Sequence, residues 1–236
     1  MLTENKLSKY LFYAIGEIAL VIIGILIALQ INNVNQDRQN RKYEVLMLNE
    51  VKESLLDDID NLKRNSKNLQ RVQYSLQEVT KMKNDPTIPR DSLYAYLDVI
   101  DSYGTSYRAN KSPFEAIESG GLDKISNPEI RNALSKLYGF RLNSMENWIW
   151  QVHGAELLKR NDIKEEIFGY NMVVDKGLTI SNQLNENSVQ ESLNHPRIDA
   201  FLYTSGWPLN ITINYMKITE REMNEMINLI EDEIKK

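Results

Sequence analysis

The segment from Tyr10 to Ile31 constrains this chain more than any other part of its sequence. It has about 22 residues, so as a helix it extends about 33 Å, close to the thickness of a bilayer's hydrocarbon core. Its Leu, Ile, Val and Phe residues together favour insertion by roughly 4 to 8 kcal/mol. The acid Glu17 opposes this by only about 2.5 to 3.5 kcal/mol. The sequence therefore predicts a transmembrane helix over residues 10–32.

Two other structures for this segment are disfavoured. A cleaved signal peptide has an apolar run of about 7–15 residues and an Ala-x-Ala-like cleavage site. Here the run is longer, and the polar sequence Gln30-Ile31-Asn32-Asn33 follows it. A core helix of a soluble protein would need partners on every side, because this run is apolar around its whole circumference.

The flanking charges bear on orientation in the membrane. Lys6 and Lys9 precede the segment and Arg38, Arg41 and Lys42 follow it, so the bias in basic residues is small. Long domains translocate regardless of such charges. We expect residues 1–9 to be cytoplasmic and the C-terminal domain to be periplasmic, outside a bacterial inner membrane.

The next part of the chain is predicted to be one long helix. Neither glycine nor proline occurs between Gly24 and Pro86, so the helix is expected to end near Lys83. Residues 33–44 are polar and read as a helical stalk, and residues 45–236 as an extramembrane helical domain. The apolar positions of the long helix mostly step by three, four or seven, as in a helix that buries one stripe. They are Val45, Leu48, Leu55, Ile59, Leu62, Leu69, Val72, Leu76 and Val79.

Further helices are marked by their start and stop signals. A short helix is expected over 91–102, and Ser112-Pro113-Phe114-Glu115 has the pattern of a capping box, ended by Gly120-Gly121. Asn127-Pro128 begins a helix whose apolar spacing continues to Phe168.

The C-terminal region has weaker signals. A weaker capping box covers 188–191, and Pro196 opens a segment that is expected to end at Gly206. The last helix is predicted over Pro208–Lys235, although residues 211–213 alone suggest a strand. No sustained alternation with paired turn signals occurs. The predicted fold class is all-α: an N-terminal transmembrane helix that continues into the long helix of an extramembrane helical bundle.

Two segments of the sequence resemble a family. YAIGEIALVIIGILIALQINNVN, preceded by ENKLSKY, resembles the N-terminal signature of a family of Bacteroidetes membrane-anchored proteins of unknown function. SPFEAIESGGLDKISNPEIRNALSKLY is similar to that family's second marker. Val34 stands where the family usually has Trp, and the usual basic run before the N-terminal signature is missing. The resemblance implies a single-pass protein with a helical extramembrane domain, and it implies no catalytic residues.

The composition excludes several classes of function. A net charge of -5, with acids and bases alternating along the helices, argues against nucleic acid as a partner. The chain has no Cys and therefore no thiolate nucleophile or Cys-based metal site. Hydrolase, NTPase and dinucleotide motifs such as G-x-S-x-G, G-x-x-x-x-G-K and G-x-G-x-x-G are missing. We expect no enzyme activity and no cofactor.

Metal binding is not expected either. His153 has Glu156 one turn further on, but no third ligand can be recognised, so a surface or capping histidine is favoured. His195 precedes Pro196 and is expected to cap a helix. The acidic run at 57–60 lacks the Gly and distal Glu of a calcium loop and is interpreted as a solvated helix face.

Aromatic residues suggest one candidate ligand site. Trp148, Trp150 and Trp207 could line a groove, although aromatic residues at helical spacing more often belong to a core.

Glu17 is the intramembrane functional candidate, because acids within a span are usually functional. On a helical wheel it shares a face with Val21, Gly24 and Ala28, and the last two form a small-xxx-small pair for helix association. Three roles remain open. Glu17 could join copies of the span or a partner span, carry protons in a motor or transporter, or snorkel to the surface.

These features together predict a membrane-anchored scaffold or interaction protein. Its partners would be membrane lipid and either further copies of the chain or other membrane-protein subunits of an envelope complex. One alternative is a periplasmic sensor or solute-binding bundle, which a cavity with convergent polar groups would favour and a filled apolar core would remove. The other is a proton-carrying subunit that works through Glu17.

Overall fold

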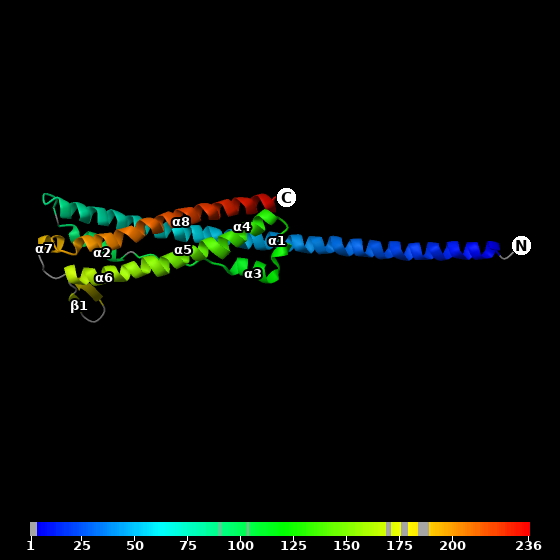
Figure 1. Cartoon of the computed structure of the whole chain (residues 1–236), viewed down its shortest axis with the longest axis horizontal. Coiled ribbons are helices and arrows are strands. Elements are labelled where there is room, and N and C mark those ends of the chain that lie inside the picture. The colour runs from blue at the N-terminus through cyan, green and yellow to red at the C-terminus, as the bar shows by residue number, and fades with distance from the viewer. Residues whose placement is uncertain (1–3, 90, 103, 169–170, 176–178, 184–188) are drawn as a thin grey trace.

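The computed structural model describes residues 4–89, 91–102, 104–168, 171–175, 179–183 and 189–236. One helix, α1 (Glu4–Asn84), runs through the bundle and projects far beyond it. The C-terminus lies at the end of the bundle from which α1 emerges (Figure 1). The all-α fold class is confirmed, with a long N-terminal apolar helix followed by further helices.

The bundle is assembled from α1, the C-terminal helix α8 (Ile198–Ile234) and a line of helical segments between them in sequence. α8 packs along α1, and α6 (Gly154–Phe168) packs against α8. The remaining elements are α2 (Leu93–Ser102), α3 (Ser112–Gly120), η1 (Leu122–Lys124), α4 (Pro128–Lys136), η2 (Leu137–Leu142), α5 (Asn143–Asn147), η3 (Trp148–His153) and α7 (Val189–Leu193).

The predicted apolar stripe of α1 forms the centre of the core. Eight of its nine predicted members are buried, and Val45 at its start is half-buried. From Tyr10 onward, Glu44 is the first buried residue of α1, so the helix enters the bundle at this point. α1 ends at Asn84, one residue beyond the predicted end.

The helix predicted from Pro128 to Phe168 is present as one helical line made of α4, η2, α5, η3 and α6. Two of these segments, η2 and η3, are π-helical, with wider turns than an α-helix. The apolar positions at helical spacing nevertheless stay buried or half-buried through both π-helical segments, from Ile130 to Val152.

The helix starts show one wrong and one confirmed prediction. The Ser112 capping box is wrong: α3 begins at Ser112 itself, and Lys111 precedes it without a side-chain cap. Asn127 does cap α4, because its side chain accepts the Glu129 N–H at 2.9 Å. After α3 the chain reverses at Gly121, whose φ of 104° favours glycine.

The predicted break before Pro208 is also wrong, because α8 continues through Gly206 and Pro208. Proline removes one helical N–H donor. Two hydroxyls nearby donate to main-chain carbonyls: Ser205 to Phe201 at 2.7 Å and Thr212 to Pro208 at 2.7 Å. The helix buries one face on both sides of the proline, which outweighs the local loss.

Two short strands that the sequence analysis did not predict, β1 (Asn171–Asp175) and β2 (Thr179–Gln183), pair antiparallel. An isolated pair of short strands gives little periodic signal. Ser188, the start of the weaker capping box, lies outside the described residues.

Candidate functional site

Residues 104–111, between α2 and α3, run along the bundle (Figure 1) and are held there by two carboxylates. The N–H of Asn110 donates to Oδ2 of Asp58 on α1 at 3.1 Å, and the N–H of Ala109 donates to Oε1 of Glu146 on α5 at 2.8 Å. The two acids therefore hold adjacent peptide groups of residues 108–112, which we call the clamped loop.

Side chains complete the attachment of the clamped loop. Lys111 Nζ lies 2.8 Å from Oε2 of Glu146 and 2.6 Å from Oδ1 of Asn143. The hydroxyl of Ser54 donates to the carbonyl of Asn110 at 3.0 Å. The loop backbone is thus fixed from both α1 and α5, as a preorganised surface requires.

Asp58 is buried, with 3% of its surface exposed, so the prediction of a solvated acidic face is wrong at this position. It lies on the same side of α1 as Leu55 and Leu62. Burial raises the pKa of Asp58 to about 6, and the charges of Asp57 and Glu146 add to the rise, while the hydrogen bond from Asn110 opposes it. Strongly perturbed acids often mark functional sites.

Tyr107, the residue before the clamped loop, lies near this acid. Its hydroxyl is buried and has no hydrogen-bond partner among the described residues. Burial and the nearby charges of Asp58 and Glu146 raise its pKa, so the hydroxyl stays protonated.

An open hollow of about 460 Å³ lies over the clamped loop. Its wall includes the indole of Trp150, which is 59% exposed. Around the indole are polar side chains from the loop, α3 and α5: Arg108, Asn110, Ser112, Glu115 and Asn147. Sequence analysis identified Trp150 as a groove residue, whereas Ser112 and Glu115 were predicted only as parts of a capping box, and Arg108, Asn110 and Asn147 carry no motif.

The structure separates Trp150 from the other two predicted groove residues. Trp148 packs edge-on against Trp207, with ring centroids 6.1 Å apart, and stacks on Tyr215 at 5.7 Å. The indole N–H of Trp148 donates to Thr212 at 2.9 Å. Trp148 and Trp207 thus pack against each other, whereas Trp150 faces the hollow.

The two histidines have structural partners. His153 is only 2% exposed, so the prediction of a surface or capping residue is wrong; its Nδ1 lies 2.8 Å from Oγ1 of Thr212. Burial lowers its pKa. His195 Nδ1 accepts the N–H of Arg197, the residue before α8, at 3.2 Å. Among the described residues no group of three or more His, Asp or Glu side chains could hold a metal ion.

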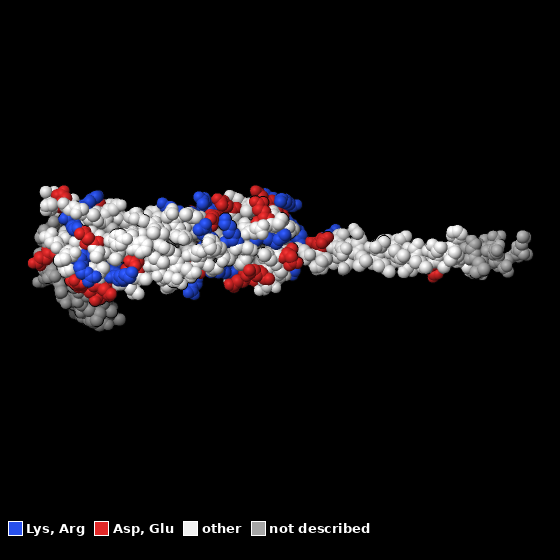
Figure 2. Space-filling model, viewed as in Figure 1, with Lys and Arg blue, Asp and Glu red and all other residues white. Residues whose placement is uncertain are grey.

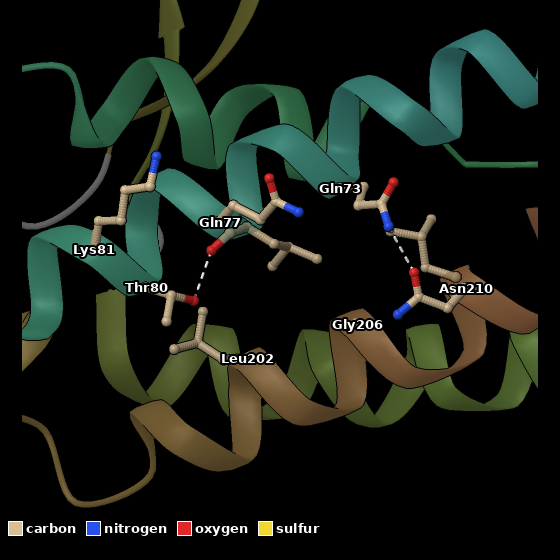
Figure 3. Close-up of a pocket in the computed structure, with 9 residues that line it drawn as sticks. Gln73, Gln77, Thr80, Lys81, Leu202, Gly206 and Asn210 are labelled. Carbon is tan, nitrogen blue, oxygen red and sulfur yellow. Dashed lines mark hydrogen bonds between the residues drawn. The ribbon is translucent and has the colours of Figure 1, made fainter.

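A second groove, of about 410 Å³, lies between α1 and α8 (Figure 3). Gln73 donates to Asn210 across one end at 2.7 Å, and Thr80 and Leu202 lie at the other. Gly206 borders it, and a side chain added there would meet nothing within 4 Å. Both hollows open at the surface, while apolar residues fill the space between the helices.

The junction between α1 and the bundle is a charged network. Arg41 lies 2.7 Å from Glu44 and donates to the main-chain carbonyl of Glu233 near the end of α8 at 2.6 Å. Glu44, in turn, accepts the N–H and hydroxyl of Ser126 at 2.7 and 2.8 Å. These bonds join α1, at the point where it enters the bundle, to α8 and to the segment before α4.

The apolar part of α1 is exposed along its whole length from Tyr10 to Ile31. Its large apolar side chains between Tyr10 and Ile31 are 50% to 78% exposed. A side chain added at Gly24 would meet nothing within 4 Å, and Glu17 and Ala28 are exposed as well. Figure 2 shows charged side chains over the bundle and very few along this projecting part. By length and composition, α1 is apolar enough to cross a membrane.

In a comparison with known proteins, one family model covers both part of the projecting helix and the clamped loop. The model of DUF6090, a family of unknown function, matches residues 17–147, which is more than half of the chain. No curated protein and no solved structure matches. The matched range begins at Glu17 and includes the clamped loop and Glu146. The chain therefore belongs to the DUF6090 family.

Proposed function

We propose that this protein is a single-pass membrane anchor that holds a helical interaction domain at a set distance from the bilayer, as a scaffold or as one subunit of an envelope complex. The observation that carries the proposal is the continuity of α1, which extends unbroken from Glu4 to Asn84. The same helix supplies the apolar segment and the centre of the bundle.

Lipid is the partner that the apolar segment lacks. Fifteen large apolar side chains between Tyr10 and Ile31 are at least half exposed. Burying each of them is worth roughly 1.5 to 3 kcal/mol, so leaving them in water is strongly unfavourable. Insertion into a bilayer removes this surface from water without any change in the fold.

The geometry suits a rigid spacer. From residue 33 to residue 84, α1 rises about 78 Å at about 1.5 Å per residue. Arg41, which lies where α1 enters the bundle, donates a hydrogen bond to the end of α8, so the bundle and the stalk move together. A partner bound to the bundle would be held at a fixed height and orientation.

The partner in the membrane is expected to cover Glu17. An acid within the hydrocarbon region is stabilised by contact with another protein, and Gly24 and Ala28 on the same face allow close approach of a second helix. We favour a second copy of the chain or another membrane subunit in this position. We expect the bundle to lie on the periplasmic side and to have no enzyme activity; the engagement of Asp58, Glu146 and Lys111 in backbone and ion-pair contacts supports a binding role.

The test uses the full-length chain. Membranes that contain it are washed with alkaline carbonate and then extracted with a mild detergent, and the mass of the native assembly is measured. We expect the chain to stay in the washed membranes and to be recovered as an assembly heavier than one copy. Release by carbonate would overturn the anchor, and a bare monomer with no partner would overturn the scaffold. Protease treatment of intact and of opened cells reports which side carries the bundle.

A further inference from the structure

We infer that the hollow over the clamped loop is a carbohydrate-binding site, with Trp150 as the surface on which a sugar ring stacks. This goes beyond the anchoring and scaffolding role. The hollow has a volume of about 460 Å³, within the range of small-molecule sites in proteins.

Trp150 presents an aromatic face that the fold leaves uncovered. Trp148, two residues earlier, is packed against Trp207 and Tyr215, whereas Trp150 remains 59% exposed at the wall of the hollow. An indole is a large rigid apolar surface with little conformational entropy to lose on binding. A ligand with one flat apolar face would gain from covering it.

The other lining groups define the rest of the ligand. Arg108 offers guanidinium donors, Asn110 and Asn147 offer both donors and acceptors, and Glu115 offers a carboxylate. Acidic and basic groups are both present, which disfavours a strongly charged ligand of either sign. The polar lining also disfavours a wholly apolar ligand, whose binding would leave these groups without water.

A neutral molecule with many hydroxyls and one apolar face satisfies all of these conditions. The ring of a saccharide has this chemistry, because its C–H groups can lie on the indole while its hydroxyls both donate to and accept from the surrounding side chains. A small peptide would also form hydrogen bonds with the Asn side chains. Its binding does not, however, require an exposed indole surrounded by acidic, basic and neutral polar groups.

The clamped loop adds the preorganisation that such a site requires. Sugar hydroxyls exchange bonds to water for bonds to protein, so the net gain depends on groups that are already in place. Here Asp58 and Glu146 fix the peptide groups of Asn110 and Ala109 from inside the bundle. Asp58 is therefore buried at a cost in stability, and it holds the clamped loop in position. Natural proteins often accept such a loss of stability where a function needs it.

The experiment uses the full chain in a detergent without a sugar headgroup, because maltosides and glucosides would compete. The protein is first applied to an array of immobilised glycans. It is then labelled with 5-fluorotryptophan, so that its three tryptophans give three fluorine NMR signals, assigned with Trp→Phe variants. Maltotriose, chitotriose and the best array glycan are titrated, with a tripeptide as the comparison probe.

We expect a glycan to shift the Trp150 signal and to leave those of Trp148 and Trp207 in place. Trp150→Ala should weaken glycan retention at least tenfold. Phe140→Ala is the matched control: Phe140 lies on the same helical line and is 63% exposed, but it is not part of the hollow, so its loss should change nothing.

Three results would overturn the site: no glycan that distinguishes the native chain from Trp150→Ala, equal loss with Phe140→Ala, or a Trp150 shift with the tripeptide alone. The native mass and carbonate resistance of the same preparations are measured in parallel. A chain that stays anchored and assembled but binds no glycan would overturn this inference and leave the scaffold intact.

Discussion

The indole N–H of Trp148 donates a hydrogen bond to the hydroxyl of Thr212 at 2.9 Å, inside the contact between η3 and α8. His153 approaches the same hydroxyl at 2.8 Å from the other end of η3. In an α-helix, residues five apart lie about 140° apart around the axis. The wider π turn of η3 brings them towards one side. Because Thr212 gives its own proton to the Pro208 carbonyl, both rings act as donors to it, which places a proton on Nδ1 of His153; burial lowers the pKa of this imidazole and so favours its neutral form.

Thr212→Val should destabilise the fold by about 2 to 4 kcal/mol, because it removes, at nearly constant volume, the acceptor of the half-buried Trp148 and the buried His153 ring N–H groups. Urea unfolding of the full chain in detergent micelles, followed by circular dichroism, measures the change. Thr204→Val is the control, since among the described residues that hydroxyl bonds only to main-chain carbonyls of α8, those of Ala200 at 2.8 Å and Phe201 at 3.2 Å. The control should stay within about 0.5 kcal/mol of the parent. Equal effects of the two variants would contradict the proposed role of Thr212.

The buried acid Asp58 should make the protein more stable in mild acid. Its pKa is about 6 in the fold against 3.8 as the model value, so the folded state binds the proton more tightly than the unfolded chain. This contribution is complete below pH 3.8 and is lost as the pH rises through 6. The contribution of Asp58 to stability should therefore be about 2 kcal/mol larger at pH 4.5 than at pH 7.5.

Asp58→Asn tests this dependence, because the amide oxygen can still accept the Asn110 N–H without carrying a charge. The variant should be at least as stable as the parent at pH 7.5, and its stability should rise less on acidification. Asp60→Asn, two positions along and exposed, should retain the full rise, because the charge of Asp60 does not contribute to the raised pKa of Asp58. If the stability of the parent and the stability of Asp58→Asn change equally with pH, the burial of an ionised Asp58 is not the cause of that change.

Substitutions at Glu17 distinguish a role in assembly from a role in proton transfer. If the acid joins two spans through hydrogen bonds, Glu17→Gln should preserve the native mass in mild detergent and Glu17→Ala should lower it. Ile18→Ala, about 100° further around the helix, should leave the mass unchanged. Retention of the assembly by Glu17→Ala would contradict the joining role. Full cellular activity of Glu17→Gln would exclude a titrating one.

Gly206 should be replaceable with a gain in stability. It lies within α8, and an added Cβ would meet nothing within 4 Å, so Gly206→Ala should stabilise the fold by about 0.5 to 1 kcal/mol through helix propensity. Gly120→Ala is the opposite case, because the added atom would collide with the hydroxyl of Tyr43. Thermal unfolding of both variants checks the pair. A loss of stability in Gly206→Ala would show that α8 needs a glycine beside Pro208.

The sequence alone determined the elements whose signals are local. A run of about 22 apolar residues predicts a span because its length matches a bilayer, and the absence of Gly and Pro up to Pro86 predicts one long helix. The apolar stripe of α1 follows from its period, and the cap at Asn127 from its residue type and the proline after it. Each of these depends on neighbours within a few turns of the chain.

The tertiary structure decided those features that depend on which distant segment packs against a helix. Pro208 stays within α8 because burial on both sides outweighs one missing hydrogen bond. Asp58 is buried because the clamped loop lies over that face of α1. Trp148 packs inward because α8 lies on its side of the helical line, whereas Trp150, two positions on, projects from the opposite side and is exposed. Propensity and period describe a single helix, whereas burial is set by whichever segment packs against it, and that segment is distant in the sequence.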